Sequence, residues 1–179
     1  MTATTTRRHL AKILLILGRL VLAAIFLVAS YAKLKPQAAG PWSGASVRIS
    51  LSMFAMQVDS YQLLPPPLVS PVAHLLPPFE LFLGLWLLSG VLLRYSALVT
   101  TLLLSGFFAT QVRTYRAGLE INCGCFGPGE RLGPKTLLHD GSFLALALAV
   151  TIGAFLLAYK RREPAALASA APGTPQGAD

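Results

Sequence analysis

Charged residues are scarce in this sequence. Asp, Glu, Lys and Arg together make up 12% of its 179 residues, whereas soluble domains contain about 25%. Hydrophobic residues reach 54%, and the few charges are bunched so that long stretches carry none. A water-soluble fold of this size would lack the polar surface to cover itself. The composition therefore excludes a soluble enzyme and predicts an integral membrane protein.

Acidic residues are the scarcer kind of charge. The chain has 7 of them against 15 Lys and Arg, which gives a net charge of +8. A nucleic-acid-binding protein gathers its basic residues on one water-facing patch. Here they flank apolar runs instead, as Arg7, Arg8 and Lys12 do at the first of them. Because membrane anchoring and topology require basic residues at such positions, we expect a lipid bilayer and no nucleic acid as the partner.

Cysteine is nearly absent. Two residues, Cys123 and Cys125, are too few for a disulfide framework. A metal site would need His74 and His139 to add to the two sulfurs. Structural zinc prefers four ligands at characteristic spacings, which this sequence lacks. We therefore predict no metal site, and the pair stays a candidate for thiol chemistry.

Long apolar runs are what the sequence has in abundance. A helix needs about 20 apolar residues to cross roughly 30 Å of hydrocarbon, and four runs approach or exceed this length. The first is too long for a signal peptide, whose apolar core has about 7–15 residues. We predict an all-α integral membrane protein that forms a bundle of four transmembrane helices. Its segments are an N-terminal tail at 1–9, a membrane domain at 10–160 with spans at 10–34, 71–93, 95–112 and 137–159, and a disordered tail at 161–179.

The connection between the first two spans, residues 35–67, is bounded by prolines. Its apolar and polar residues partly alternate and partly follow a helical period, so periodicity alone does not decide its structure. We predict a short interfacial helix near residues 46–62 that covers the end of the bundle. An irregular loop is the alternative.

The orientation in the membrane is predicted from the basic residues outside the spans. The two sides carry equal numbers of Lys and Arg, so the count alone is a tie. Both tails, however, carry dense clusters, at 7–12 and at 160–162. Cytoplasmic segments are enriched in Lys and Arg. We therefore predict a multi-pass protein of the cell membrane with both termini in the cytoplasm and the cysteines on the extracytoplasmic, oxidising side.

The two cysteines lie in a glycine-rich segment, residues 122–127, just before the fourth span. Cysteines two positions apart are close enough to bond, and the glycine between them gives the tight ring the backbone freedom that it needs. A strained disulfide is easily reduced and acts as an exchange site, while Arg113, Arg116 and Arg131 nearby favour the thiolate form. A small structural disulfide and two idle thiols are the alternatives.

Glu80 is the second candidate, because a carboxylate inside an apolar span costs about 2.5–3.5 kcal/mol at the helix centre. It is either functional or a partner for Lys33 or Arg19 that only fixes the packing. Lys33 and Asp140 are expected on the same side of the membrane as the cysteines. Asp140 is also suited to capping the fourth span, because acids favour a helix N-terminus.

Three sequence segments together resemble the MauE branch of the DoxX-like membrane proteins. Two of them, shared widely among DoxX-like proteins, are S-x-x-K-L-x-P at residues 30–36 and P-x-E-x-x-x-G at residues 78–84. The most specific is C-G-C-F-G at residues 123–127, followed by Asp140 at the start of the fourth span. The resemblance covers roughly residues 13–158, nearly the whole membrane portion.

The resemblance implies a four-helix bundle distantly similar to vitamin K epoxide reductase. MauE proteins are implicated in the maturation of methylamine dehydrogenase, whose small subunit needs many periplasmic disulfides, so the implied role is redox assistance. By position, Cys123 and Cys125 would be the redox pair, with Glu80, Lys33 and Asp140 as supporting polar residues. Vitamin K epoxide reductases also use a membrane-embedded cysteine pair beside the quinone, and this chain has only one pair.

The leading hypothesis is a membrane redox-accessory protein. Its Cys-Gly-Cys pair would exchange with an extracytoplasmic thioredoxin-like partner or client and pass electrons to a membrane quinone, the candidate cofactor. Glu80 joins the cysteines as a candidate catalytic residue, and Asn122 and Arg113 are further supporting residues. Activity as a thiol-disulfide or quinone oxidoreductase stays open. The alternative is a non-enzymatic membrane assembly factor or scaffold with a structural disulfide, and a weaker one is a small-solute carrier that would need to form a homodimer.

Overall fold

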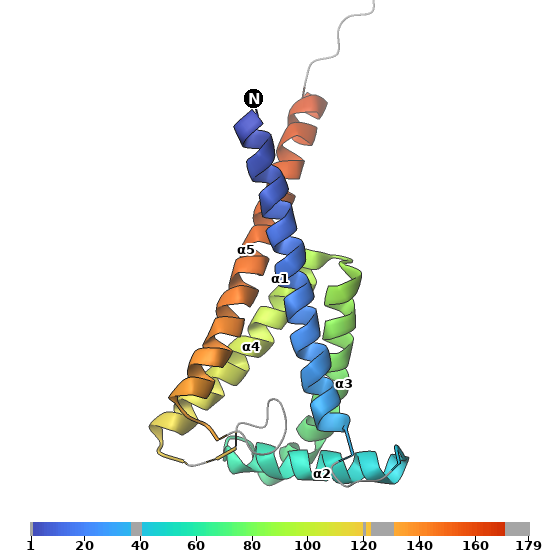
Figure 1. The fold of residues 1–179 in the computed structure, drawn as a ribbon, viewed down its shortest axis with the longest axis vertical. Coiled ribbons are helices and arrows are strands. Elements are labelled where there is room, and N and C mark those ends of the chain that lie inside the picture. The colour runs from blue at the N-terminus through green and yellow to red at the C-terminus, as the bar shows by residue number, and fades with distance from the viewer. Residues whose placement is uncertain (1, 37–40, 120, 123–130, 171–179) are drawn as a thin grey trace, which may run out of the picture.

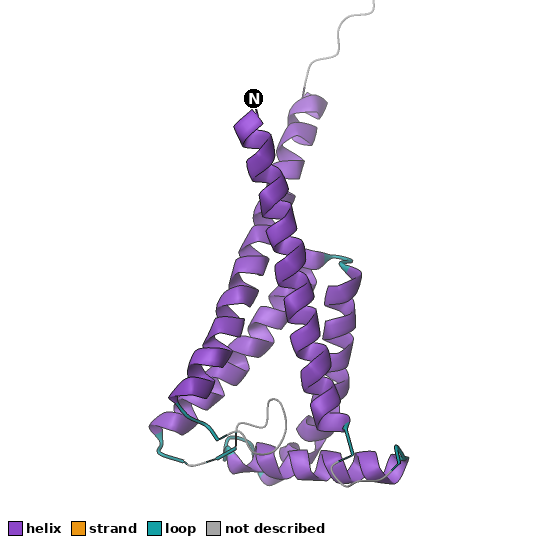
Figure 2. Cartoon of the chain, viewed as in Figure 1, coloured by secondary structure: helices purple, strands orange, loops and turns teal. Residues whose placement is uncertain are grey.

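The computed structural model describes residues 2–36, 41–119, 121–122 and 131–170. This part of the chain folds into helices, shown in Figures 1 and 2, and four of them contain stretches long and apolar enough to cross a membrane. The predicted all-α bundle of four transmembrane helices is thereby confirmed. The helices are α1 (Thr2–Leu34), α2 (Gly44–Ser60), α3 (Pro66–Ser89), α4 (Leu93–Arg116) and α5 (Pro134–Ala170), and the candidate spans are His9–Leu34, Pro66–Ser89, Leu93–Arg116 and Pro134–Tyr159.

The two inner spans have bounds that differ from the prediction. α3 starts at Pro66, where proline suits the first turn because its missing N–H would lack a partner in any case. It ends at Ser89 because Gly90 adopts a left-handed conformation, with φ of 70°, which glycine reaches without strain. α4 runs past the predicted end at 112, and its last turn carries Arg113 and Arg116. Their positive charges suit a helix C-terminus.

The two outer helices are longer than the spans that they contain. α1 begins at Thr2 and so includes most of the predicted N-terminal tail. α5 continues to Ala170, which differs from the disorder predicted for residues 161–179. A helix propagates more easily than it nucleates, and residues 165–170 are rich in alanine, the residue with the highest helix propensity. Both properties favour an extension of the span into the tail.

α2 confirms the short helix predicted between the first two spans, and the loop alternative is wrong. A capping box fixes its start. The Ser43 hydroxyl accepts a hydrogen bond from the Ser46 backbone N–H at 3.2 Å, and the Ser46 hydroxyl accepts one from the Ser43 backbone N–H at 3.0 Å. These bonds satisfy N–H groups that a helix start otherwise leaves without partners. Figure 1 shows α2 lying crosswise over one end of the bundle.

The surface of α2 matches a position at the membrane interface. One side is buried against the bundle through Ser50, Leu51 and Phe54. The exposed residues fall on two further sides of a helix with 3.6 residues per turn. An apolar side for lipid beside a polar side for water is the pattern of an interfacial helix. The apolar side consists of Ile49, Met53 and Met56, and the polar side of Arg48, Ser52 and Asp59.

The four spans pack mainly as two pairs, α1 with α3 and α4 with α5. Small residues allow the close approach, as is usual between membrane helices. A Cβ added at Gly84 of α3 would lie 2.9 Å from the Leu27 Cγ and 3.3 Å from the Ala23 carbonyl oxygen of α1. Figure 1 shows the two pairs crossing near the α3–α4 turn and diverging toward α2.

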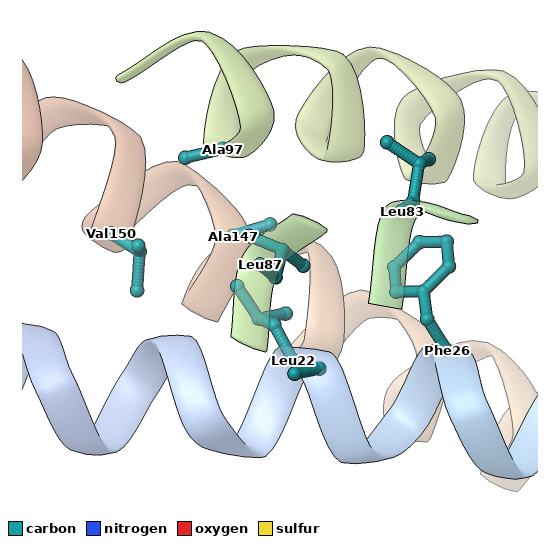
Figure 3. Close-up of a cluster of buried hydrophobic side chains, with 8 residues drawn as sticks. Leu22, Phe26, Leu83, Leu87, Ala97, Ala147 and Val150 are labelled. Carbon is teal, nitrogen blue, oxygen red and sulfur yellow. The ribbon is translucent and has the colours of Figure 1, made fainter. Parts of the chain in front are cut away.

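The hydrophobic core lies where the two pairs meet. All four spans contribute to it, and Figure 3 shows their side chains gathered in the space between the helices. We call this region the apolar cluster, and we call the part of the bundle next to α2 the α2 end. The apolar cluster consists of Leu22, Ala23, Phe26, Leu83, Leu87, Ala97, Ala147 and Val150.

Candidate functional site

A cavity of about 250 Å³ lies between the two helix pairs at the α2 end. All five helices contribute to its wall, which is mostly aliphatic and aromatic. Ligand sites for small molecules are typically concave and apolar, with a few polar groups that fix the orientation of the ligand. The aromatic residues of the wall are Phe26, Phe54, Tyr61, Phe107, Phe108 and Phe143, and the polar ones are Lys33, Gln57, Glu80, Thr110, Gln111 and Asp140.

Lys33 and Glu80 form a buried ion pair in this wall. The Lys33 Nζ donates to both carboxylate oxygens of Glu80, at 2.9 and 2.8 Å, and the two side chains are only 5% and 3% exposed. The Lys33 Nζ also lies 5.4 Å from the centre of the Phe54 ring of α2. Two opposite charges in such a place compensate one another, because either one alone would be costly to bury. Of the two partners considered for Glu80, Lys33 is therefore the one observed.

The local sequence explains why these two side chains meet. Lys33 lies in the last turn of α1, where a positive charge is favoured by the helix dipole. Glu80 follows Pro77, a proline inside α3. The Ser30 hydroxyl of α1 donates to the Pro77 carbonyl oxygen at 2.8 Å. This bond fixes α1 against α3, and Lys33 and Glu80 bond across the same interface.

Gln111 and Asp140 form a second polar contact, between α4 and α5. The Gln111 Nε2 donates to the Asp140 Oδ2 at 2.6 Å, and both residues line the cavity. The prediction that Asp140 caps the fourth span is wrong, because α5 begins earlier, at Pro134. Proline suits the first helical position, so the carboxylate of Asp140 lies in the second turn and accepts from a side chain of α4.

Cys123 and Cys125 lie outside the described residues, but the residues that flank them are placed. Asn122 and Arg131 form an isolated antiparallel bridge, and the Leu132 backbone N–H donates to the Ile121 carbonyl oxygen at 2.9 Å. These contacts join the two described stretches that flank the cysteines, between α4 and α5. This attachment lies at the end of the bundle where α4 ends and α5 begins, which is also the end where Asp140 lies.

The remaining predicted site residues are less closely connected with the cavity. Arg113 is exposed in the last turn of α4 and Asn122 is exposed at the base of the cysteine segment, and neither lines the cavity. Sequence reasoning missed Gln111, which is 2% exposed. A single amide within an apolar span is a signal that could have found it, because polar side chains in spans often bond to neighbouring helices.

A model of the family described as Methylamine utilisation protein MauE matches residues 11–153. The chain belongs to the MauE family. No curated protein and no solved structure matches it. The MauE match includes every residue that lines the cavity, from Ile25 to Phe143. Together with the four candidate spans it identifies a multi-pass membrane protein of methylamine utilisation, while the wider DoxX-like relationship stays a prediction.

Proposed function

We propose that this chain is a membrane redox-accessory protein. Cys123 and Cys125 exchange with an extracytoplasmic thioredoxin-like partner and deliver electrons to a quinone held in the cavity. The observation that carries the proposal is the position of the cavity, which lies at the end of the bundle to which the cysteine segment is attached. An apolar site beside a redox-active pair is what electron transfer from water-soluble thiols to a lipid-soluble acceptor requires.

The lining of the cavity supports a quinone as the ligand. Aromatic side chains such as Phe54 and Phe107 offer flat apolar surfaces against which a ring can stack. A quinone also has two carbonyl oxygens, which need polar partners when they are buried. Lys33 on one helix pair and Gln111 on the other would supply such partners from two sides of the cavity.

The electrons and protons exchanged among the cysteine pair, the quinone and the thioredoxin-like partner balance. A bound quinone supplies an acceptor for electrons and protons. As an S–S bond forms between Cys123 and Cys125, the two thiols give up two electrons and two protons, which equals what the reduction of a quinone to a quinol consumes. A dithiol of the partner protein then reduces the disulfide by exchange and is itself left with a disulfide.

The side of the membrane on which this happens is part of the proposal. The basic clusters of the two tails favour termini in the cytoplasm, which leaves the cysteine segment on the extracytoplasmic, oxidising side. The name of the family supports a client that belongs to methylamine utilisation. Methylamine dehydrogenase is the client that we propose, and disulfide formation during its maturation is the step that this chain would support.

The proposal is tested by the redox state of the pair in living cells. Cells are quenched with acid and their thiols are trapped with an alkylating reagent that adds mass, so that the reduced and oxidised forms of the full-length protein separate. We expect both forms of the Cys123/Cys125 pair, with the balance shifting to the reduced form when quinone synthesis is blocked. A pair that stays in one state under both conditions contradicts the proposal.

A Cys125→Ser variant separates redox exchange from a scaffold. Cys123 then cannot form a disulfide within the chain. A mixed disulfide between Cys123 and a partner cysteine is therefore not resolved, and the partner stays covalently bound. We expect a covalent adduct that disappears on reduction and is absent from the Cys123→Ser/Cys125→Ser control. If no adduct forms and the double variant still supports active methylamine dehydrogenase, the chain acts as a scaffold.

A further inference from the structure

The two carboxylates of the cavity differ in their surroundings. Glu80 is 3% exposed, and both its oxygens accept hydrogen bonds from the Lys33 Nζ. Such double binding to an ammonium group stabilises a carboxylate as an anion. Asp140 is 13% exposed, and its Oδ2 accepts from the uncharged amide of Gln111. Of the two, Asp140 is the carboxylate that lies beside a side chain exposed to water.

His139 lies between Asp140 and the surface. Its Nδ1 is 3.8 Å from the Asp140 Oδ1, and its side chain is 53% exposed. A small rotation of the ring closes a gap of this length and brings the two atoms within hydrogen-bond reach, over which proton transfer operates. Imidazole is the side chain whose charge changes most readily near neutral pH. His139 and Asp140 therefore form two consecutive steps between water and the cavity.

We propose that His139 and Asp140 conduct protons between the aqueous phase and the quinone in the cavity, which rests on the function proposed above. Asp140 gives a proton to a quinone oxygen twice during reduction, once for each oxygen, and each time it regains one from His139, which is reprotonated from water. The electrons come from the cysteine pair, whose two thiol protons are released to water, so the protons balance. The other titratable groups of the wall are Lys33, Tyr61 and Glu80.

The test uses the full-length protein in lipid nanodiscs, with dithiothreitol as the thiol donor and a short-chain ubiquinone as the acceptor. An Asp140→Asn variant keeps an acceptor oxygen for the Gln111 amide but cannot carry a proton. We expect its rate of quinone reduction to fall by about 100-fold, the scale on which a lost proton-transfer group acts. Binding of the ubiquinone, measured at equilibrium with a radiolabelled analogue, stays unchanged.

Chemical rescue distinguishes proton transfer by His139 from a purely structural role. A His139→Ala variant loses activity, and added imidazole restores it because the site is exposed to water. His74→Ala is the matched control, since His74 is exposed on α3 and does not line the cavity. Its activity stays at the wild-type level. An infrared difference spectrum of quinone reduction should also show a carboxylic-acid C=O band that is missing in the Asp140→Asn variant.

The outcomes separate this inference from the function on which it rests. If the wild type neither binds ubiquinone nor reduces it, the proposed function fails and the proton route fails with it. If the wild type is active and the Asp140→Asn variant is equally fast, only the proton route is overturned. The same holds if the His139→Ala variant is impaired but imidazole does not restore it, or if the Asp140→Asn variant leaves the infrared band in place.

Discussion

The two ends of the bundle are built in opposite ways. In the apolar cluster, side chains of all four spans interlock, and Leu22, Leu87 and Ala97 are 0% exposed. At the α2 end the same spans surround a cavity of about 250 Å³ with a buried ion pair in its wall. Close packing makes an interior rigid. The apolar cluster therefore fixes the angle at which the helix pairs diverge. The cavity at the α2 end can then stay open although no side chains fill it.

The polar contacts of the α2 end fit this division of roles. Lys33 with Glu80 joins α1 to α3, and Gln111 with Asp140 joins α4 to α5. Each contact lies within a helix pair, so it strengthens the pair without drawing the two pairs together across the cavity. Substitutions at the two ends are accordingly expected to differ in what they change.

The largest effect is expected where a charge would lose its partner. Lys33→Met leaves the Glu80 carboxylate buried without its cation, which should lower the free energy of unfolding by about 3–5 kcal/mol. Unfolding is measured by titration with sodium dodecyl sulfate from mild detergent. Lys35→Met, at an exposed lysine of the same helix end, is the control and should change little. A Lys33→Met variant as stable as the control would contradict the compensating role of the pair.

A matched pair of truncations on α3 compares packing at the two ends directly. Leu87→Ala removes a side chain of the apolar cluster that is 0% exposed and should cost about 2–5 kcal/mol of unfolding free energy. Leu76→Ala removes the same atoms from the wall of the cavity, where they already face empty space, so its cost should be clearly smaller. Equal losses in the same titration would mean that the cavity is as tightly packed as the cluster.

Two glycine substitutions test the close approach of α1 and α3. A methyl group at Gly84 would lie 2.9 Å from the Leu27 Cγ, whereas one at Gly106 of α4 meets nothing within 4 Å. Gly84→Ala should therefore destabilise the bundle by about 1–3 kcal/mol through overpacking. Gly106→Ala should be neutral or stabilise it by up to about 1 kcal/mol, because alanine favours helix. The reverse order of stabilities would show that the two helices are not in this register.

The smallest effect is expected for a single hydrogen bond between spans. The hydroxyls of Thr101 and Thr151 are 2.9 Å apart between α4 and α5. Thr101→Val removes this bond with little change of shape and should cost about 0.6 kcal/mol, the average for such bonds in membrane proteins. A double-mutant cycle with Thr151→Val isolates the pairwise contribution. A coupling of zero would show that the contact does not stabilise the pair.

Composition was sufficient to predict the four spans, because each is a long apolar run with few charges. Their bounds were less predictable. Gly90 ends α3 through its left-handed backbone, and Pro134 allows α5 to begin before Asp140. Helix ends of this kind depend on single residues, whose effect is lost when hydropathy is averaged over a window. The helix at α2 was expected, although its mixed periodicity left a loop as the alternative.

The site was predicted only in part. Glu80 and Lys33 stood out because charges are rare in spans, and their pairing was one of two alternatives. Gln111 was missed, since an amide is a weaker signal than a charge. The cavity could not be predicted at all, because it depends on how far the helix pairs diverge, which no single segment of sequence encodes. The roles of Cys123 and Cys125 stay predictions.

In the function that we propose, a quinone in the α2-end cavity oxidises the Cys123/Cys125 pair. The most direct measurement is the rate at which the reduced pair loses its free thiols in nanodiscs after a short-chain ubiquinone is added. We predict rapid loss in the wild type and much slower loss in a Leu76→Trp variant, whose larger side chain would fill the cavity. Thiols that persist in the wild type, or that disappear equally fast in both proteins, would contradict the claim.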